Sequence, residues 1–240
     1  MSSSEFNTTR WSVVQNAGAT EEDVRREALR DLCEAYWYPL YAYLRRIGKD
    51  ADRAGDLVQG LFAKLIENDG LAQVEKAGGS FRSWLITCLR NHERDVLDHE
   101  GALRRGGGVQ VLSIDIRDGE HRYGAEPAGG VDPDAAFERA WAQQVLDNAF
   151  TALEEEYRTS GRTDVFDRLA EGLKSGQEAV DQERVARELG LSSVALRVAL
   201  HRLRGRYRLA VLGEVRATLG DGMDPGEELQ SLLRALEGGA

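Results

Sequence analysis

The chain has 240 residues, of which 42% are hydrophobic, and a formal net charge of -10 at pH 7. This length allows one sizeable hydrophobic core or two small ones, and two compact domains are the default expectation. No apolar run approaches the roughly 20 residues that span a bilayer, and the opening MSSSEFNTTRW lacks the layout of a secretion signal. We therefore expect a cytoplasmic protein without membrane association.

Three stretches in the first half carry apolar residues at helical spacing. The first runs from Leu29 to Ile47, where only Pro39 interrupts the stripe and predicts a kink or a break. The second covers 52–67 and the third runs from Ser80 to about His99, with a glycine-containing loop, NDGLAQVEKAGGS, between them. The sequence predicts a bundle of three helices and an all-α fold class.

Cys33 and Cys88 are the only cysteines, and both fall on these apolar stripes. Two buried thiols in a reducing compartment fit this placement better than a disulfide framework. Cys88 and His92 are spaced i, i+4, so a metal site that includes Cys33 is conceivable, but a packed core is the preferred interpretation. We assign no metal and no cofactor.

Residues 106–134 break the helical pattern. They contain seven glycines, two prolines, six acids and two arginines, which gives a net charge of -4. This composition predicts a flexible acidic linker with at most one short extended piece, VQVLSIDI. The adjacent RRGGG lacks the GxxxxGK[ST] spacing of a phosphate-binding loop, so we interpret it as part of the linker.

Helical spacing resumes at Phe137 and runs to Leu153, returns from Val165 to Leu173, and a different pattern follows. Residues 183–189 predict a short helix, Gly190 suits a turn with positive φ, and Ser192 suits the N-cap of a further helix. This pattern is typical of a helix-turn-helix motif.

The second helix of this motif has a basic outer face. Residues 193–208 hold five arginines and no acid, although the chain as a whole is acidic. Core-facing spacing is predicted for Leu196, Leu200, Leu203 and Tyr207. The outer residues Ser193, Val194, Arg197, His201 and Arg204 are then candidates for base contacts, and Arg202, Arg206 and Arg208 for phosphate contacts. A solvated basic helix that caps a bundle is the alternative.

Three motifs resemble those of bacterial RNA polymerase sigma factors. LGLSSVALRVALHRLRGRYR resembles the end of their fourth conserved region, DLVQGLFAKLIE the polymerase-binding helix of their second region, and FRSWLITCLRNHERDVLD their promoter-melting segment. The order and the intervening linker resemble the extracytoplasmic-function (ECF) group, which keeps only the second and fourth regions. TRWSVV, YWYPLYAYLRR and RRGGG are similar to a subgroup common in planctomycetes and acidobacteria.

The resemblance implies two small helical domains joined by the acidic linker. The implied parts are an N-terminal extension (1–27), a region 2 domain (28–105), the linker (106–134), a region 4 domain (135–218) and a C-terminal tail (219–240). The implied function is that of a sigma factor, which is not an enzyme: it binds core RNA polymerase, directs it to specific promoters and assists promoter melting.

The resemblance also assigns roles to residues. Polymerase binding is implied for Asp56, Leu57, Gln59, Phe62 and Lys64. Contacts to the minus-10 element are implied for Ser80, Phe81, Arg82, Trp84, Arg90, Asn91 and Arg94, with core packing as the alternative for Trp84. Contacts to the minus-35 element are implied for Ser192, Ser193, Val194, Arg197, His201, Arg202, Arg204 and Arg206.

The implied partners are promoter DNA and core RNA polymerase, through the coiled coil of its largest subunit and through its flap. The sequence leaves open whether an anti-sigma factor, a regulatory kinase or the chain's own tails control it. Departures from the family pattern are Gly55-Asp56, where many members carry two acids, Val198 in place of a common serine, and Ala199 in place of a common basic residue. They prevent the transfer of docking strength and promoter sequence from relatives.

Two other functions remain open. A helix-turn-helix regulator that binds operators without polymerase is the first alternative, and an adaptor that does not bind DNA is the second. No pair of Ser, His, Asp or Cys side chains has a spacing that favours catalysis. The C-terminal residues Leu229, Leu232, Leu233 and Leu236 predict a short helix, which we expect to pack against the fourth-region domain.

Overall fold

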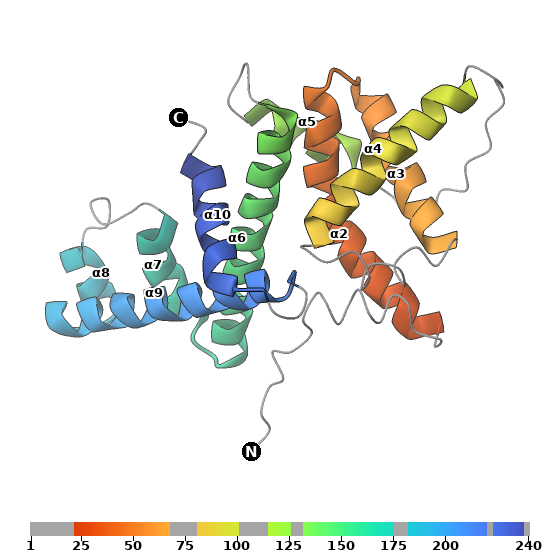
Figure 1. The fold of residues 1–240 in the computed structure, drawn as a ribbon. Coiled ribbons are helices and arrows are strands. Elements are labelled where there is room, and N and C mark those ends of the chain that lie inside the picture. Colours follow the sequence, from red (N-terminus) through yellow and green to blue (C-terminus); the bar gives the residue numbers. More distant parts are fainter. Residues whose placement is uncertain are drawn as a thin grey trace. The chain divides into compact units, whose positions relative to one another are not determined.

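The computed structural model describes residues 22–67, 81–100, 115–125, 132–174, 182–219 and 223–237. The regular elements within these ranges are α-helices (Figure 1): α2 (Glu22–Arg46), α3 (Ala51–Glu67), α4 (Phe81–Glu100), α5 (Ile116–Ala125), α6 (Pro133–Thr159), α7 (Thr163–Lys174), α8 (Gln182–Glu188), α9 (Ser193–Arg216) and α10 (Pro225–Glu237). The predicted all-α fold class is confirmed. The TRWSVV motif, the loop before α4 with Ser80, and most of VQVLSIDI lie outside the described residues.

The chain divides into two compact units. The first comprises residues 1–144 and 215–240, and the second comprises residues 145–214. The division differs from the predicted domain limits, because the beginning of α6 and the C-terminal segment group with the first half of the chain.

The centre of the first unit is formed by α2, α3 and α4. All three helices contribute fully buried side chains, which include Tyr36, Leu40, Leu44, Leu57, Leu61, Leu85 and Leu89. Helix α2 continues through Pro39, so the sequence was wrong to predict a break there, although a kink was the other expectation. Gly48, with φ of 89°, turns the chain after α2, and the Asp50 carboxylate accepts a hydrogen bond from the backbone N–H of Arg53 to cap α3.

Helix α5 corrects the prediction for residues 106–134, which is wrong for Ile116–Ala125. The Asp115 carboxylate accepts hydrogen bonds from the backbone N–H groups of Arg117 and Asp118 and starts the helix. Gly119 is buried against α2, where an added Cβ would lie 3.2 Å from ring atoms of both Trp37 and Tyr41. A glycine that suggests a flexible linker is therefore the residue that lets α5 approach α2.

Polar contacts hold α5 on α2 as well. Glu120 accepts hydrogen bonds from the Tyr41 hydroxyl at 2.6 Å and from Arg45 Nε at 2.8 Å, and these bonds lower the pKa of the Glu120 carboxyl. The Arg122 guanidinium lies 3.8 Å from the centre of the Tyr38 ring. Tertiary contacts of this kind override the low helix propensity of a glycine-rich acidic segment.

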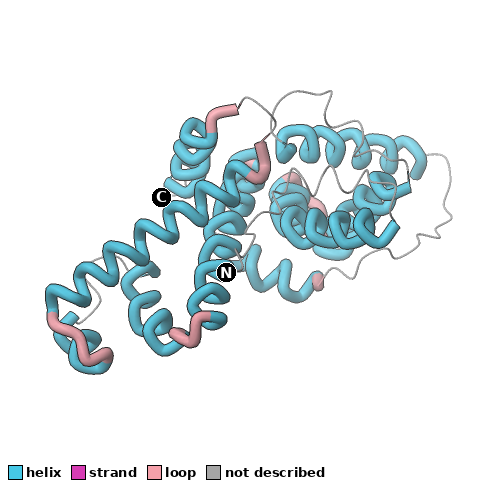
Figure 2. Tube along the Cα trace, turned by 90° about the horizontal axis from the view of Figure 1, so that it is seen from below, coloured by secondary structure: helices cyan, strands magenta, loops and turns pink. Residues whose placement is uncertain are grey.

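The second unit has a core of its own. Its buried members come from α6 to α9: Leu153, Tyr157, Phe166, Leu169, Ala170, Val185, Ala186, Leu196, Leu200 and Leu203. Short loops join α6 to α7 and α8 to α9 (Figure 2). This unit carries the predicted helix-turn-helix segment.

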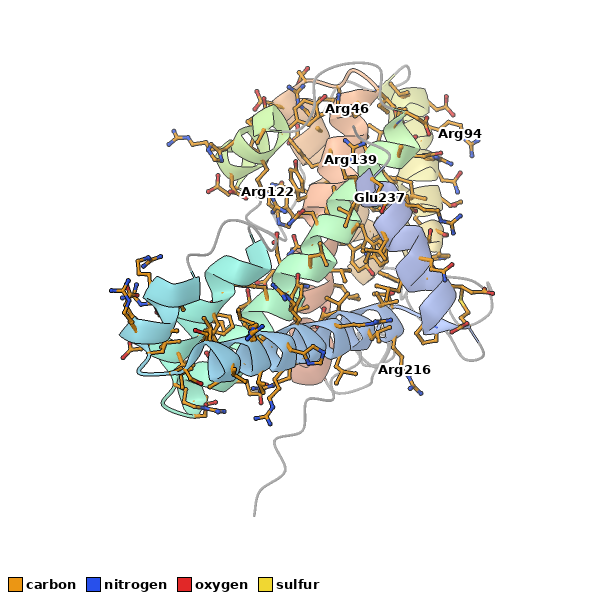
Figure 3. All side chains as sticks on the ribbon, turned by 90° about the vertical axis from the view of Figure 1, so that its left-hand side faces the viewer. Arg46, Arg94, Arg122, Arg139, Arg216 and Glu237 are labelled. Atoms are coloured by element: carbon orange, nitrogen blue, oxygen red, sulfur yellow. The ribbon has the colours of Figure 1, made fainter. Side chains whose placement is uncertain are left out.

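Helix α10 belongs to the first unit, together with residues 135–144 of the predicted fourth-region domain and apart from residues 145–214 of that domain. The prediction that the C-terminal segment packs against the fourth-region domain therefore agrees with this grouping only for the beginning of α6. Helix α10 buries Glu228 and Leu232, one turn apart, on one face. In Figure 3 its end, marked by Glu237, lies beside the first half of α6, marked by Arg139. The buried carboxylate of Glu228 is the unexpected member of this face, because burial of an unpaired charge is costly.

Candidate polymerase and nucleic-acid interface

Helix α3 exposes polar side chains and buries apolar ones. Of the five residues assigned to polymerase binding by resemblance, Asp56 and Lys64 are exposed, Gln59 is half-buried, and Leu57 and Phe62 are buried. Lys64 Nζ lies 2.8 Å from a carboxylate oxygen of Asp95 on α4, and this hydrogen bond lowers the pKa of Asp95. The polar residues thus lie at or near the surface, whereas the two apolar residues support α3 from the core.

The beginning of α3 is in contact with α5. A Cβ at Gly55 would lie only 2.9 Å from Cδ1 of Ile116. An acid at position 55, common in the family that the motif resembles, would meet the Ile116 side chain. Gly55 therefore has a local structural reason, the room that it leaves for α5.

Helix α4 separates the residues assigned to the minus-10 element into two groups. Phe81 and Arg82 are buried, and Trp84 is half-buried. The Phe81 ring packs edge-on against Tyr36, with ring centroids 5.2 Å apart. The exposed group consists of Arg90, Asn91 and Arg94, and Figure 3 shows Arg94 pointing away from the helix.

Arg82 is held by acids from two other helices. Its Nε lies 3.0 and 2.8 Å from the two carboxylate oxygens of Glu138 on α6. Its Nη1 forms an ion pair with Glu228 on α10, and its guanidinium lies 4.3 Å from the centre of the Trp141 ring. Only 7% of Arg82 is exposed, so these contacts replace water around the cation.

Arg90 also has a carboxylate partner on α6. Its Nη2 pairs with Asp134, and its Nε donates a hydrogen bond to the Tyr43 hydroxyl at 3.1 Å. These hydrogen bonds, first the one to Asp134, raise the pKa of Arg90. Unlike Arg82, the Arg90 side chain remains 45% exposed and can reach a second partner.

The turn between α8 and α9 has the predicted chemistry. Gly190 adopts φ of 63°, and the Leu191 N–H donates a hydrogen bond to the carbonyl of Ala186 at 2.8 Å. The Ser192 hydroxyl accepts a hydrogen bond from the backbone N–H of Ala195, which makes it the N-cap of α9. The predictions of a positive φ at 190 and of a cap at 192 are confirmed.

The α9 outer face is open and without acids. We define it by its exposed residues Ser193, Val194, Arg197, Val198, His201, Arg202, Arg208 and Leu209. The opposite side of α9 buries Leu196, Leu200 and Leu203 as predicted, and Tyr207 is half-buried there. The Tyr207 hydroxyl donates a hydrogen bond to the carbonyl of Leu146 on α6 at 3.1 Å.

Arg204 and Arg206 are less accessible than the other arginines of this helix. Both are half-buried. Arg206 pairs with Glu156 on α6, and its guanidinium lies 4.8 Å from the centre of the Tyr157 ring. Arg206 therefore anchors α9 to α6, whereas Arg197, Arg202 and Arg208 stay exposed.

Comparison with known families assigns the first group of helices. Residues 32–102 match the family model of sigma-70 region 2. The match includes most of α2 and all of α3 and α4, and it supports a sigma-70 family factor with a role in RNA polymerase binding and promoter melting. No curated protein and no solved structure matches the chain significantly.

The helices that contact region 2 from outside lie beyond the matched residues. They are α5, α6 and α10, which supply Glu120, Asp134, Glu138 and Glu228 to arginines of α2 and α4. Sequence reasoning missed these partners of region 2. A signal existed only on α6, where Asp134, Glu138 and Trp141 share one face at i, i+4 and i+7.

Cys33 and Cys88 are free thiols in the described part of the chain. Burial raises the pKa of the Cys33 thiol to about 12 and also raises that of Cys88, so both stay protonated at neutral pH. Among the described residues, no three His, Cys, Asp or Glu side chains converge as a metal site would require. Nor does any described helix have the length and apolar character to cross a membrane.

Proposed function

We propose that the protein is a sigma factor of the ECF type, which binds core RNA polymerase, selects promoters and assists their melting. The observation that carries the proposal is the region 2 match over residues 32–102 in a chain whose other compact unit ends in a capped helix with a basic, acid-free outer face. The further likeness to the planctomycete and acidobacterial subgroup stays a prediction.

Polymerase docking is proposed for the polar side of α3. Asp56, Gln59 and Lys64 are positioned by a helix whose apolar face is fixed in the core, so their contacts require little reordering. The coiled coil of the largest polymerase subunit is the proposed partner of this surface, and the polymerase flap is the proposed partner of the second unit.

Promoter melting is proposed for α4 and the loop that precedes it. Asn91 and Arg94 are exposed and can contact a displaced strand as the helix stands. Each unstacked base costs a few kcal/mol, which stacking and pocket contacts of about 1 to 3 kcal/mol per base offset. Phe81 and Arg82 are buried, so they would take part only after a rearrangement, and half-buried Trp84 supports either role.

Reading of the minus-35 element is proposed for the α9 outer face. Its N-terminal residues Ser193, Val194 and Arg197 have the position that meets base edges in a helix-turn-helix. Arg202 and Arg208 are suited to phosphates because they are exposed and unaccompanied by acids on α9 before Glu214. Arg206 already pairs with Glu156, so Arg206 is the weakest candidate among the residues proposed to contact the minus-35 element.

Transcription with purified components tests the proposal. The chain is expected to bind core polymerase, to give run-off transcripts from a pool of genomic promoters, and to make minus-10 thymines sensitive to permanganate only when core enzyme is present. The net charge of -10 opposes tight binding of DNA by the free chain. Nanomolar site binding without polymerase, and no strand opening with it, would favour the operator-binding regulator.

A further inference from the structure

We infer that α10 is an intramolecular competitor of DNA on region 2, and that its release gives DNA access to Arg82 of α4. This inference rests on the proposed function. The carrying observation is that one buried arginine of α4 is coordinated by carboxylates from α6 and α10 at once.

The contacts of Arg82 leave little room for another anion. Glu138 accepts a hydrogen bond from Nε, Glu228 forms an ion pair with Nη1, and the Trp141 ring lies against the guanidinium. Arginine binds phosphate through the same N–H groups that bind carboxylate. A DNA phosphate or base would therefore have to replace Glu228, Glu138 or both.

Of the two carboxylates, the one on α10 is the more easily removed. Glu138 belongs to a 27-residue helix, whereas α10 has 13 residues, a length at which isolated helices are marginal in water. Helix α10 buries only Glu228 and Leu232, and Leu233 beside them is 48% exposed. Helix α10 is thus bound through one narrow face, and its release would also remove a carboxylate from Arg82.

The charge of the C-terminal segment supports the same conclusion. Residues 223–237 carry four acids and one arginine. An acidic segment next to the proposed melting helix repels the DNA backbone while it is docked. Asp134 holds Arg90 in a similar way, so two of the cations assigned to the minus-10 element have intramolecular acid partners.

The fraction of chains in which α10 is released determines how strongly docked α10 reduces the affinity for DNA. If the released form is a minor state of at most about 10%, the apparent affinity for DNA is reduced at least about tenfold. A substitution that weakens docking should recover most of this factor.

The test compares two variants of the full chain that lose the same charge from the same helix. Glu228→Gln removes the buried partner of Arg82 with little change in size, and Glu237→Gln removes an exposed carboxylate with no ion pair to Arg82. The probe is a fluorescent single-stranded oligonucleotide with the non-template minus-10 sequence of a promoter found by run-off transcription. Glu228→Gln should tighten binding of this probe by the free chain about tenfold, and Glu237→Gln by less than about twofold.

Equal binding by the two variants, or weaker binding by Glu228→Gln, would overturn the inference and leave Glu228 as a structural partner. Hydrogen exchange of the wild-type chain provides a second test that requires no variant. The amides of residues 225–237 should lose protection when core polymerase and promoter are added, and unchanged protection would also refute the competitor role. Failure of the proposed function is recognised separately, because wild-type chain and core enzyme would then give no transcripts.

Discussion

The docking of α5 on region 2 can be tested at its two glycines. Gly119→Gln places a long side chain where a Cβ alone would lie 3.2 Å from the rings of Trp37 and Tyr41. Gly124→Gln makes the same change in the same helix, but a Cβ at position 124 has no neighbour within 4 Å. Both changes raise the helix propensity of α5 by the same amount. Only Gly119→Gln lacks space for the new side chain, so only this variant should displace α5.

The contacts of Glu120 determine how much stability Gly119→Gln should lose. Displacement of α5 removes the hydrogen bonds from Tyr41 and Arg45, each worth about 1.5 to 3 kcal/mol when one partner is charged. The Glu120 side chain is 40% exposed, so solvent screening reduces the contribution of these bonds to stability. We expect Gly119→Gln to lower the free energy of unfolding by about 1 to 3 kcal/mol.

Urea denaturation measures the free energy of unfolding of each variant, and hydrogen exchange measures the protection of the α5 amides. Gly124→Gln should leave stability unchanged or raise it by up to about 1 kcal/mol, with α5 amides still protected. Gly119→Gln should abolish that protection. Identical stability and protection in the two variants would refute the docking of α5 through Gly119.

Three further predictions concern α9 and α4. Replacement of a minus-35 thymine by deoxyuridine should weaken promoter binding by about 0.8 kcal/mol where exposed Val198 contacts the methyl group, and Val198→Ala should abolish this difference; sensitivity that persists in the variant argues against the contact. Arg208→Ala should reduce the slope of log affinity against log salt by about 0.9, whereas Arg206→Ala, which removes the partner of Glu156, should lower stability with the slope unchanged; the reverse pattern would exchange their roles. Burial lowers the pKa of His92, so stability should fall as pH drops below the ordinary value of about 6.5, and His92→Gln should flatten this dependence in urea titrations across that range.

Protonation of His92 destabilises the folded chain. A histidine whose pKa is lower in the folded state binds more protons when unfolded, so protonation favours the unfolded chain. The stabilising contribution of the neutral imidazole is present above the ordinary pKa and is lost as pH falls. A stability profile that rises on acidification through this range would contradict the assignment.

Local pattern was sufficient to predict the helices and the turn that build the candidate site. Apolar periodicity located α3 and α4 within a residue or so, because both bury a continuous stripe. Turn chemistry located the start of α9, because only a few residues suit a positive φ and a helix N-cap. These features depend on neighbours in sequence, which the sequence displays directly.

Features that depend on distant contacts were not predictable. Arg82 has the same local pattern whether its partner is DNA or Glu138, which lies 56 residues away. Glycine is common in linkers, so the sequence alone does not distinguish Gly119 from a linker residue. Only the nearby rings of Trp37 and Tyr41 show that a larger residue would not fit at this position. The difference between a basic residue that waits for DNA and one that is already paired is a tertiary property.

The two proposed DNA surfaces differ in how the chain's acids are distributed around them. Arg82 and Arg90 of α4 meet Glu138, Glu228 and Asp134, while the α9 outer face has no acid of its own helix before Glu214. Duplex DNA can therefore meet α9 without displacing any contact described on its outer face, whereas use of Arg82 requires an existing ion pair to open. A factor built this way would bind duplex before it could stabilise a separated strand, and the net charge of -10 would further weaken capture of single strands away from polymerase. We expect the order of contacts at a promoter, minus-35 first and minus-10 second, to follow from this difference in electrostatic occupancy.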